Sequence, residues 1–439
     1  YMKRTGQRLW EKAKKLIPGG NQLLSKRAEM FLPGAWPAYF SKAKGPYIWD
    51  LDGNKYLDMS IMGIGACPLG YADPDVNKAV TAAVGRGSMA TWNTPDEVEL
   101  AELLTKIHPW ADMVRYARTG GESMAIAARI ARAHTGRDTV AFCGYHGWSD
   151  WYLATNLKDP KGLNEHLLAG LEPKGVPEGL RGSILPFRYN RIDELEALVK
   201  QTKGKLAAII MEPIHGEEPK DNFLQKVRAI ATQTGAVLVF DEISIGWKET
   251  VGGSHLMYKV NPDIAVFSKG MSNGYPMAAI IGKRKVMESA QDTFISSTYW
   301  TESIGPAAAL ATIKKIKRLN VPRHLIRIGT LANSGLKRLS KKHGINVQIG
   351  GTATMGFFSF EYGPLSNAVK TLFTQEMLKR GILAANRFYP SYAHSEKHIK
   401  HYLQVMDKVF ALMKDAIDSG TVEKKLQGPV AHSGFQRLN

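Results

Sequence analysis

The feature that most constrains the fold of this chain is a series of short, wholly apolar segments, each followed by polar residues. Residues 237–240 read Val-Leu-Val-Phe before Asp241, and residues 264–267 read Ile-Ala-Val-Phe before Ser268 and Lys269. Runs of this length without a polar residue fit strands that are buried on both faces of a parallel sheet. The strands expected on this pattern are residues 139–143, 206–211, 237–241, 264–268 and 277–281.

Amphipathic stretches alternate with these strands and have the apolar spacing of helices. They are residues 123–134, 192–201, 222–234 and 304–319. Strands and helices in alternation predict an α/β fold with a mostly parallel sheet and flanking helices. In such sheets ligands bind at the carboxyl ends of the strands.

The two ends of the chain look different from its middle. Residues 1–60 combine a basic helix, expected at 5–16, with a hairpin signal at Asp52-Gly53-Asn54, and residues 320–439 combine helices with mixed strands near 355–362. Because 439 residues exceed the usual length of one domain, we expect a second, smaller α+β domain built from both termini. The predicted organisation is an N-terminal segment of residues 1–69 that joins the small domain, a large domain of residues 70–305 and a C-terminal small domain of residues 306–439.

The composition indicates which cellular compartment and which kinds of binding partner to expect. Two cysteines, Cys67 and Cys143, are too few for a disulfide framework, and no apolar run approaches the roughly 18 residues of a membrane span, so we expect a cytoplasmic protein without a membrane partner. The 58 Lys and Arg against 40 Asp and Glu give a net charge of +18. No aromatic-interleaved basic stripe accompanies this charge, which argues against nucleic acid. A non-enzymatic protein that binds a polyanion remains the alternative to an enzyme.

An acid and an amine are expected at the same edge of the sheet. Asp241 follows one buried strand and Lys269 follows the next. A lysine in such a place is desolvated, so its pKa falls and its amine becomes nucleophilic. An aldehyde cofactor of the pyridoxal phosphate type would use both groups, with Lys269 as its Schiff base and Asp241 on its pyridinium nitrogen. A buried ion pair between the two residues is the other interpretation.

Three further motifs lie where strands and helices meet. Residues 118–123, with Gly120 and Gly121, precede a helix, so backbone N–H groups and the helix dipole point at an anion there, although an ordinary turn has the same sequence. The turn at residues 142–148 presents aromatic side chains that suit a planar ring. Glu212 places a second acid at the same edge.

Two other sequence patterns do not predict a site. Residues 63–68 begin like a dinucleotide fingerprint but lack its third glycine. His394, His398 and His401 have helical spacing, but Ser395 is expected to cap that helix and to leave His394 outside it. We therefore predict neither a nicotinamide site nor a metal site.

The order of the motifs resembles the class III, fold-type I pyridoxal-phosphate aminotransferases, and within them the glutamate-1-semialdehyde aminomutase branch. The resemblance covers most of the chain and implies the seven-stranded sheet of that fold. The residues that carry it are Thr119–Ser123, Gly144–Gly147, Glu212-Pro213, Phe240-Asp241-Glu242 followed by Gly246, and Ser268-Lys269-Gly270.

The resemblance implies a role for each of three catalytic candidates. Lys269 would bind the cofactor as a Schiff base and later carry a proton between the substrate and the cofactor. Asp241 would keep the ring nitrogen protonated, and Glu212 would lie near the substrate.

The resemblance also implies which residues surround the cofactor. Tyr145 would stack on one face of its ring, with His146 beside it in the same turn, and Ile243 would pack behind the ring. Gly120 and Gly121 would bind the phosphate through their backbone amides.

The remaining implied roles concern the partner subunit and the substrate. Thr301, with Thr298 as the second choice, would reach the cofactor phosphate of a neighbouring subunit, so a homodimer is expected. Lys26 or Arg27 would correspond to the carboxylate-binding arginine of the branch, and Arg387 could line a pocket for an anionic or sugar-like substrate. One departure from the family is Gly246-Trp247-Lys248, where the family has Gly-Phe-Arg.

The predicted function is transfer of an amino group to or from a small aldehyde or ketone through Lys269. It is either a shift within one molecule, as in glutamate-1-semialdehyde 2,1-aminomutase, or a transamination between two substrates that include a keto-sugar or another anionic keto compound. Decarboxylation and racemisation are alternatives, because the same cofactor stabilises any carbanion at the carbon it binds.

Overall fold

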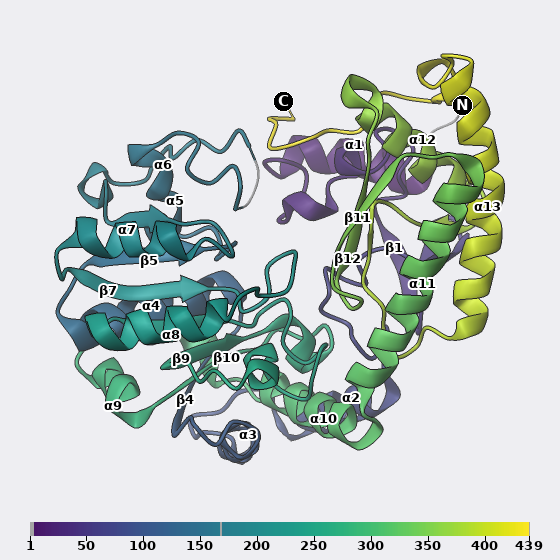
Figure 1. The fold of residues 1–439 in the computed structure, drawn as a ribbon. Helices are drawn as coiled ribbons and strands as arrows, with labels where there is room; N and C mark the ends of the chain where they lie inside the picture. Colours follow the sequence, from purple (N-terminus) through teal and green to yellow (C-terminus); the bar gives the residue numbers. More distant parts are fainter. Residues whose placement is uncertain (1–3, 167–168, 439) are drawn as a thin grey trace. The chain divides into compact units, whose positions relative to one another are not determined.

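The chain folds into two compact units in a computed structural model that describes residues 4–166 and 169–438 (Figure 1). Unit 2 is Pro74–Pro322, and unit 1 combines Tyr1–Asp73 with Arg323–Asn439. These limits differ from the boundaries expected at residues 69–70 and 305–306. Helix α10 (Ile304–Leu319) packs along α2 (Pro74–Arg86), and this contact places both helices in unit 2.

Unit 2 is built on a seven-stranded sheet with the order β4-β10-β9-β8-β7-β5-β6. Strand β10 is antiparallel to both of its neighbours, and the other pairs of adjacent strands are parallel. The mostly parallel sheet expected from the sequence is thereby confirmed. The strands are β4 (Met113–Ala117), β5 (Thr139–Cys143), β6 (Ile184–Pro186), β7 (Leu206–Met211), β8 (Val237–Asp241), β9 (Ile264–Phe267) and β10 (Ala278–Gly282).

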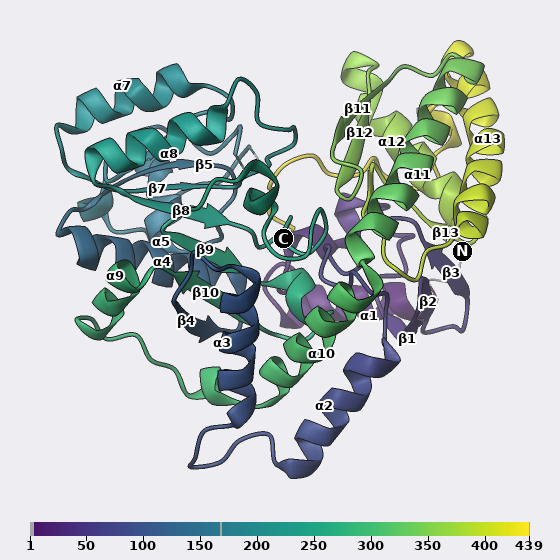
Figure 2. The same ribbon diagram turned by 60° about the horizontal axis from the view of Figure 1, so that its bottom comes forward.

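Helices cover both faces of this sheet, which explains why its central strands are wholly apolar. In β8, Val237 and Val239 pack into the core on the side of α4 (Gly120–Thr135), whereas Leu238 and Phe240 pack on the side of α8 (Phe223–Thr234). Figure 2 shows α7 and α8 on one side of the strands and α4 and α5 on the other. The remaining helices of unit 2 are α3 (Pro95–Ile107), α5 (Asp150–Leu153), α6 (Thr155–Lys158), α7 (Ile192–Thr202) and α9 (Arg284–Met287).

Unit 1 contains two small sheets and four longer helices. One sheet has the order β1-β2-β3-β13 and the other β11-β12-β14. Strand β13 pairs in parallel with β3, so residues from both ends of the chain share one sheet. The strands are β1 (Phe40–Lys44), β2 (Tyr47–Asp50), β3 (Lys55–Asp58), β11 (Val347–Gly351), β12 (Gly356–Phe360), β13 (Ile382–Leu383) and β14 (Arg387–Phe388), and the helices are α1 (Thr5–Leu16), α11 (Val321–His343, which begins at the boundary), α12 (Ser366–Leu378) and α13 (Glu396–Asp418).

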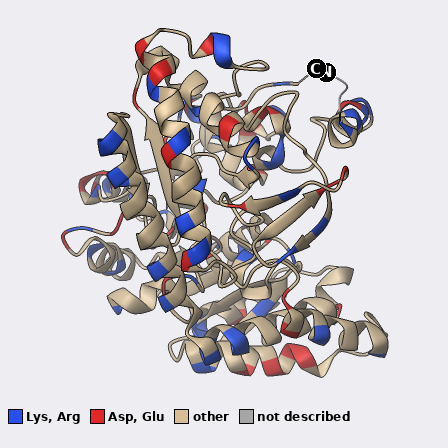
Figure 3. Ribbon diagram, turned by 90° about the vertical axis from the view of Figure 1, so that its right-hand side faces the viewer, with Lys and Arg blue, Asp and Glu red and all other residues tan. Residues whose placement is uncertain are grey.

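The positive charge of the chain belongs mainly to unit 1. Unit 1 has 28 Lys and Arg against 13 Asp and Glu, whereas unit 2 has 30 against 27. Figure 3 shows the cations in blue, many of them along the long helices. Among the described residues, no helix is both long enough and apolar enough to cross a membrane.

The core of the sheet predicts where the fold is most sensitive to truncation. Leu238 lies in the central strand β8 and is 0% exposed. Leu238→Ala should lower the free energy of unfolding by about 2–5 kcal/mol, because a cavity adds to the loss of apolar burial. In the matched control Val98→Ala, at an exposed position of α3, the change should stay within about 0.5 kcal/mol. Urea denaturation measures both, and equal effects would contradict the burial of β8.

Candidate active site

The edge of the sheet at the carboxyl ends of β8 and β9 brings an acid and a lysine together. The two strands are parallel neighbours, and Asp241 pairs with Val266, three residues before Lys269. The Nζ atom of Lys269 donates a hydrogen bond to Oγ of Ser244 at 2.6 Å. Ser244 lies three residues after Asp241 in the chain, so this bond holds the amine at the loop that follows Asp241. Lys269 has φ +42°, a left-handed conformation that is unfavourable for a side chain with a Cβ and that clusters at functional sites.

Asp241 is buried and hydrogen-bonded to His146. The Oδ2 atom of Asp241 lies 2.8 Å from Nδ1 of His146, and Oδ1 accepts the N–H of Ile243 at 3.0 Å. The Nε2 atom of His146 lies 2.9 Å from the carbonyl oxygen of Cys143, which can only accept, so Nε2 carries a proton. Burial raises the pKa of Asp241, and the hydrogen bond from His146 opposes this shift.

Glu212 follows β7 and fixes the turn that carries Tyr145. Its Oε2 atom accepts the N–H of Tyr145 at 3.2 Å and a hydrogen bond from Nδ1 of His215 at 2.5 Å. Burial raises the pKa of Glu212, but the hydrogen bond and charge of His215 outweigh this effect, so the pKa lies below its usual value. Gly144 has φ +104°, and a Cβ there would lie 2.4 Å from Oε2 of Glu212, so only glycine fits.

The first turn of α4 forms a cradle of glycines beside the acid and the lysine. A Cβ on Gly120 would lie 3.0 Å from Cδ1 of Ile243, and a Cβ on Gly147 would lie 2.7 Å from Cα of Gly121. The backbone of the turn therefore approaches the helix start closely. Thr119 is the N-cap of this 16-residue helix, whose dipole favours an anion at its first turn.

Thr301 lies on a loop that is attached to the strand before α4. It belongs to the short helix Thr298–Thr301, where its Oγ1 atom donates to the carbonyl oxygen of Thr298 at 2.9 Å. Arg118 forms an ion pair of 2.7 Å with Glu302. Its Nη2 atom also donates to the carbonyl oxygens of Trp300 and Glu302, both at 2.9 Å. Thr301 itself is exposed.

The three predicted substrate cations belong to unit 1, and the acid and lysine described above belong to unit 2. Lys26 and Arg387 are exposed. The guanidinium of Arg27 donates from Nη1 to the carbonyl oxygen of Gln436 at 3.0 Å and lies 5.7 Å from the ring centre of Phe435. Arg27 is therefore engaged by the C-terminal segment.

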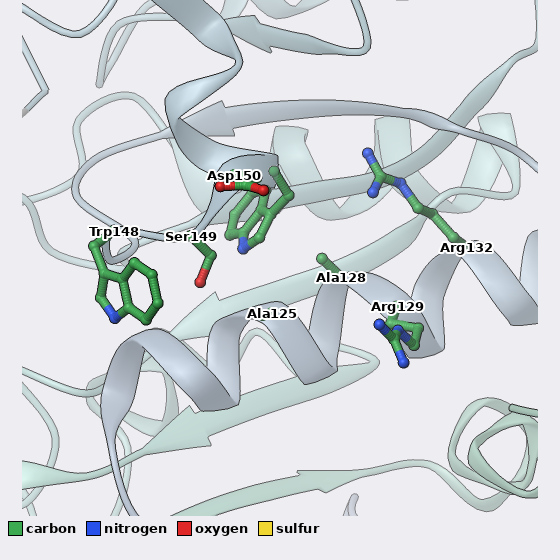
Figure 4. Close-up of a pocket in the computed structure, with 8 residues that line it drawn as sticks. Ala125, Ala128, Arg129, Arg132, Trp148, Ser149 and Asp150 are labelled. Atoms are coloured by element: carbon green, nitrogen blue, oxygen red, sulfur yellow. The ribbon is translucent and has the colours of Figure 1, made fainter. Parts of the chain in front are cut away.

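A cavity of about 450 Å³ opens beside α4 (Figure 4). Trp148, Ser149 and Asp150 line one side of it, and Arg129 and Arg132 of α4 line another. Arg129 donates to the carbonyl oxygen of Phe294 at 3.0 Å, and Arg132 donates to that of Asp138 at 2.9 Å. Neither the lysine nor the two acids of the candidate site line this cavity.

The structure adds contacts that the sequence did not indicate. Ser244 touches the Lys269 amine and His215 touches Glu212, while Nδ1 of His166 accepts the N–H of Gly144 at 3.2 Å. A single serine or histidine between motifs carries no pattern of its own. In the sequence, the only signal for Ser244 is its position between Asp241 and Gly246, two residues of the motifs described above.

Comparison with known proteins agrees with this arrangement. The sequence profile described as "Aminotransferase class-III" matches residues 33–410. The glutamate-1-semialdehyde 2,1-aminomutase of Acetivibrio thermocellus is 32% identical over 424 residues, which cover 92% of this chain and 97% of that protein. The 3-aminobutyryl-CoA aminotransferase of Cloacimonas acidaminovorans is 29% identical over 418 residues, which cover 92% and 96%.

Two solved structures have the same fold across almost the whole chain. The FumI protein of Sphingopyxis sp. MTA144, in a form with pyridoxal phosphate as internal aldimine, has a TM-score of 0.85 at 27% identity and covers 95% of this chain and 98% of its own. An omega-transaminase from Sphaerobacter thermophilus has a TM-score of 0.82 at 25% identity, with 94% and 98% covered. Fold and site thus define a fold-type I pyridoxal-phosphate enzyme. The chain belongs to the class-III aminotransferase family.

The residues present fit pyridoxal 5′-phosphate, the cofactor of this family. A buried acid suits the ring nitrogen, and a lysine amine at the same edge suits the aldehyde. The first turn of α4, with Gly120 and Gly121, supplies backbone N–H groups for a phosphate.

The pair of His215 and Glu212 predicts a pH-dependent contribution to stability. Burial lowers the pKa of His215, but Glu212 outweighs this and raises it, while the pKa of Glu212 is lowered. Stability from the pair is therefore complete between the unfolded values of about 4.3 for Glu and 6.5 for His. It is lost as pH falls through the lowered pKa of Glu212 or rises through the raised pKa of His215.

His215→Ala should accordingly lower the free energy of unfolding by about 1–2 kcal/mol at pH 6, and by less at pH 9.5. His215→Asn, which can donate a hydrogen bond but carries no charge, should lose the dependence on pH and keep part of the stability. Urea denaturation at the two pH values measures this. A loss of equal size at both would contradict an ion pair.

Proposed function

We propose that this chain moves an amino group to or from a small aldehyde or ketone that carries an anionic group, with Lys269 as the cofactor-binding lysine. The observation that carries the proposal is that Lys269 and Asp241 lie at the carboxyl ends of two adjacent parallel strands. Family membership favours an enzyme over a non-enzymatic polyanion-binding protein. We propose the reducing cytoplasm as its compartment, and the low number of cysteines, two in the chain, fits this.

Each residue of the cluster has a part in this proposal. When bound, pyridoxal phosphate withdraws electrons from the carbon that carries the amino group. Lys269 would bind the aldehyde carbon and then hold or release a proton at Nζ. Asp241 would hold a proton on the ring nitrogen, and His146, which is hydrogen-bonded to Asp241 and to the carbonyl oxygen of Cys143, would keep that carboxylate oriented.

Tyr145 and Glu212 would shape the side where the substrate enters. Glu212 fixes the backbone of Tyr145, which is 40% exposed and could stack on a planar group. His215 neutralises much of the charge of Glu212, which lessens the repulsion that an anionic substrate would meet. Ile243, which packs on Gly120, would close the opposite side.

The substrate is proposed by class only. One relative is named for a shift within glutamate 1-semialdehyde and the other for an aminotransfer on 3-aminobutyryl-CoA. Both names fit a carbonyl compound with an acidic or activated acyl group. Arg387 is exposed and is the better candidate in unit 1 for binding an anion, because Arg27 is engaged by the C-terminal segment.

Replacement of the lysine tests the function. Lys269→Ala should abolish turnover, because no other group supplies the amine, while circular dichroism should show an intact fold. The wild-type protein with pyridoxal phosphate should be yellow. Full activity of Lys269→Ala would overturn the proposal.

The reaction class is tested by a donor and acceptor screen on the yellow protein. The donors are glutamate, a β-aminoacyl-CoA and an amino sugar, and glutamate 1-semialdehyde alone tests the internal shift. Transamination should bleach the visible absorption with a donor and restore it with a keto acceptor, whereas an aminomutase should convert glutamate 1-semialdehyde without a second substrate. Release of CO₂ or racemised substrate without bleaching would contradict amino transfer.

We also propose that the active form is a homodimer in which Thr301, or Thr298, reaches the cofactor phosphate of the partner. Support comes from the surface around this loop. Tyr299 is 72% exposed and Phe294 is 84% exposed. Two such exposed aromatic residues on one segment of the chain favour an interface with another protein surface.

Tyr299→Glu should weaken this dimer, because a buried charge without a partner is unfavourable at an interface. Sedimentation should show the wild type at twice 48.5 kDa and the variant shifted towards the monomer, with a lower affinity for pyridoxal phosphate. Phe40→Glu, at an exposed aromatic residue of unit 1, should leave the mass unchanged. A fully active monomeric wild type would contradict the proposal.

A further inference from the structure

Two lysine amines converge on one residue, Ser244. The Nζ atom of Lys269 donates to its hydroxyl oxygen at 2.6 Å, and the Nζ atom of Lys248 donates to its carbonyl oxygen. Ser244 lies three residues after Asp241, in the loop that follows β8. The hydroxyl and the carbonyl of a single residue therefore connect the two amines.

Lys248 is unusual because it is 1% exposed. Lysine is almost never fully buried, since the ammonium loses its hydration. The neighbouring Trp247 is fully buried as well. Lys248 stands where the resembling family has arginine, so a cation of different length and shape holds this loop in the present chain.

We propose that Ser244 and Lys248 are positioning residues for the Lys269 amine, with the Ser244 hydroxyl setting the direction of the amine and Lys248 holding the backbone of Ser244 in place. The inference rests on the proposed role of Lys269. It explains how a flexible side chain of four methylenes is kept at one place at the sheet edge. An amine held in a fixed direction reaches an aldehyde with less loss of conformational freedom.

Lys248 acts on Lys269 through Ser244, because the two amines bind the carbonyl oxygen and the hydroxyl of this one residue. A shift of the Ser244 backbone would therefore change the direction of the Lys269 amine. The other ionisable groups at this edge are Asp241 on β8, Glu212 after β7 with His215, and His146 and Tyr145 on the turn after β5. The variants below leave all of these unchanged.

The test follows capture of pyridoxal phosphate by the cofactor-free protein, which is independent of turnover. The rise of visible absorbance is recorded against pH for the wild type and four variants. Ser244→Ala should slow capture about fivefold, the effect of one lost hydrogen bond. Lys248→Met should slow capture by a similar factor, because the bond that holds the backbone of Ser244 is lost. Ser244→Thr and Lys248→Arg, which keep the hydroxyl and the cation, should stay close to the wild type.

Wild-type capture rates in both Ser244→Ala and Lys248→Met would overturn the inference. If Lys248→Met fails to fold, Ser244→Ala decides by its rate, because it removes a single oxygen atom from a half-buried residue. Lys269→Ala separates the two proposals. If that variant still forms a bond to the cofactor that borohydride reduces, the role of Lys269 is wrong. If it does not, and Ser244→Ala still captures at the wild-type rate, only the positioning role fails.

Discussion

The parallel pairing of β8 with β9 is the constraint on which the rest of the site depends. Because the two strands run in the same direction and are hydrogen-bonded neighbours, the residues after them reach the same edge. Asp241 and Lys269 thereby lie at the same edge although they are 28 positions apart in the sequence. The apolar side chains before them pack into helices on both faces, so the edge is placed by the core of unit 2.

Burial gives this edge its chemistry because each charged group needs a partner there. Asp241 is hydrogen-bonded to His146, and Glu212 is paired with His215. The two acids are thus fixed by different partners and have pKa values shifted in opposite directions, up for Asp241 and down for Glu212. Opposite shifts in neighbouring acids are a mark of sites where protons are moved.

Much of this arrangement could be predicted from the sequence, since it follows from local pattern. The limits of β5, β7 and β8 agree with those expected, because a wholly apolar run with a polar end is a strong strand signal. The boundary between the units differs from the expected one. Helix α10 has an apolar face that either unit could cover, and only its packing on α2 shows that it belongs to unit 2.

Contacts that depend on tertiary structure could not be foreseen in this way. Ser244 and His215 lie in loops, where a serine or a histidine has many uses, and their role appears only when a second strand brings Lys269 or Glu212 within reach. The conformation of Lys269 with positive φ leaves no trace in the sequence either. The roles of Thr301, Lys26, Arg27 and Arg387 stay predictions.

The most direct measurement is to reduce the yellow protein with borohydride and to locate the cofactor by mass spectrometry of its peptides. The account predicts a single labelled peptide with the cofactor on Nζ of Lys269. A label on another lysine, above all on the buried Lys248, or no label at all, would contradict the claim that the carboxyl edge of β8 and β9 holds the cofactor.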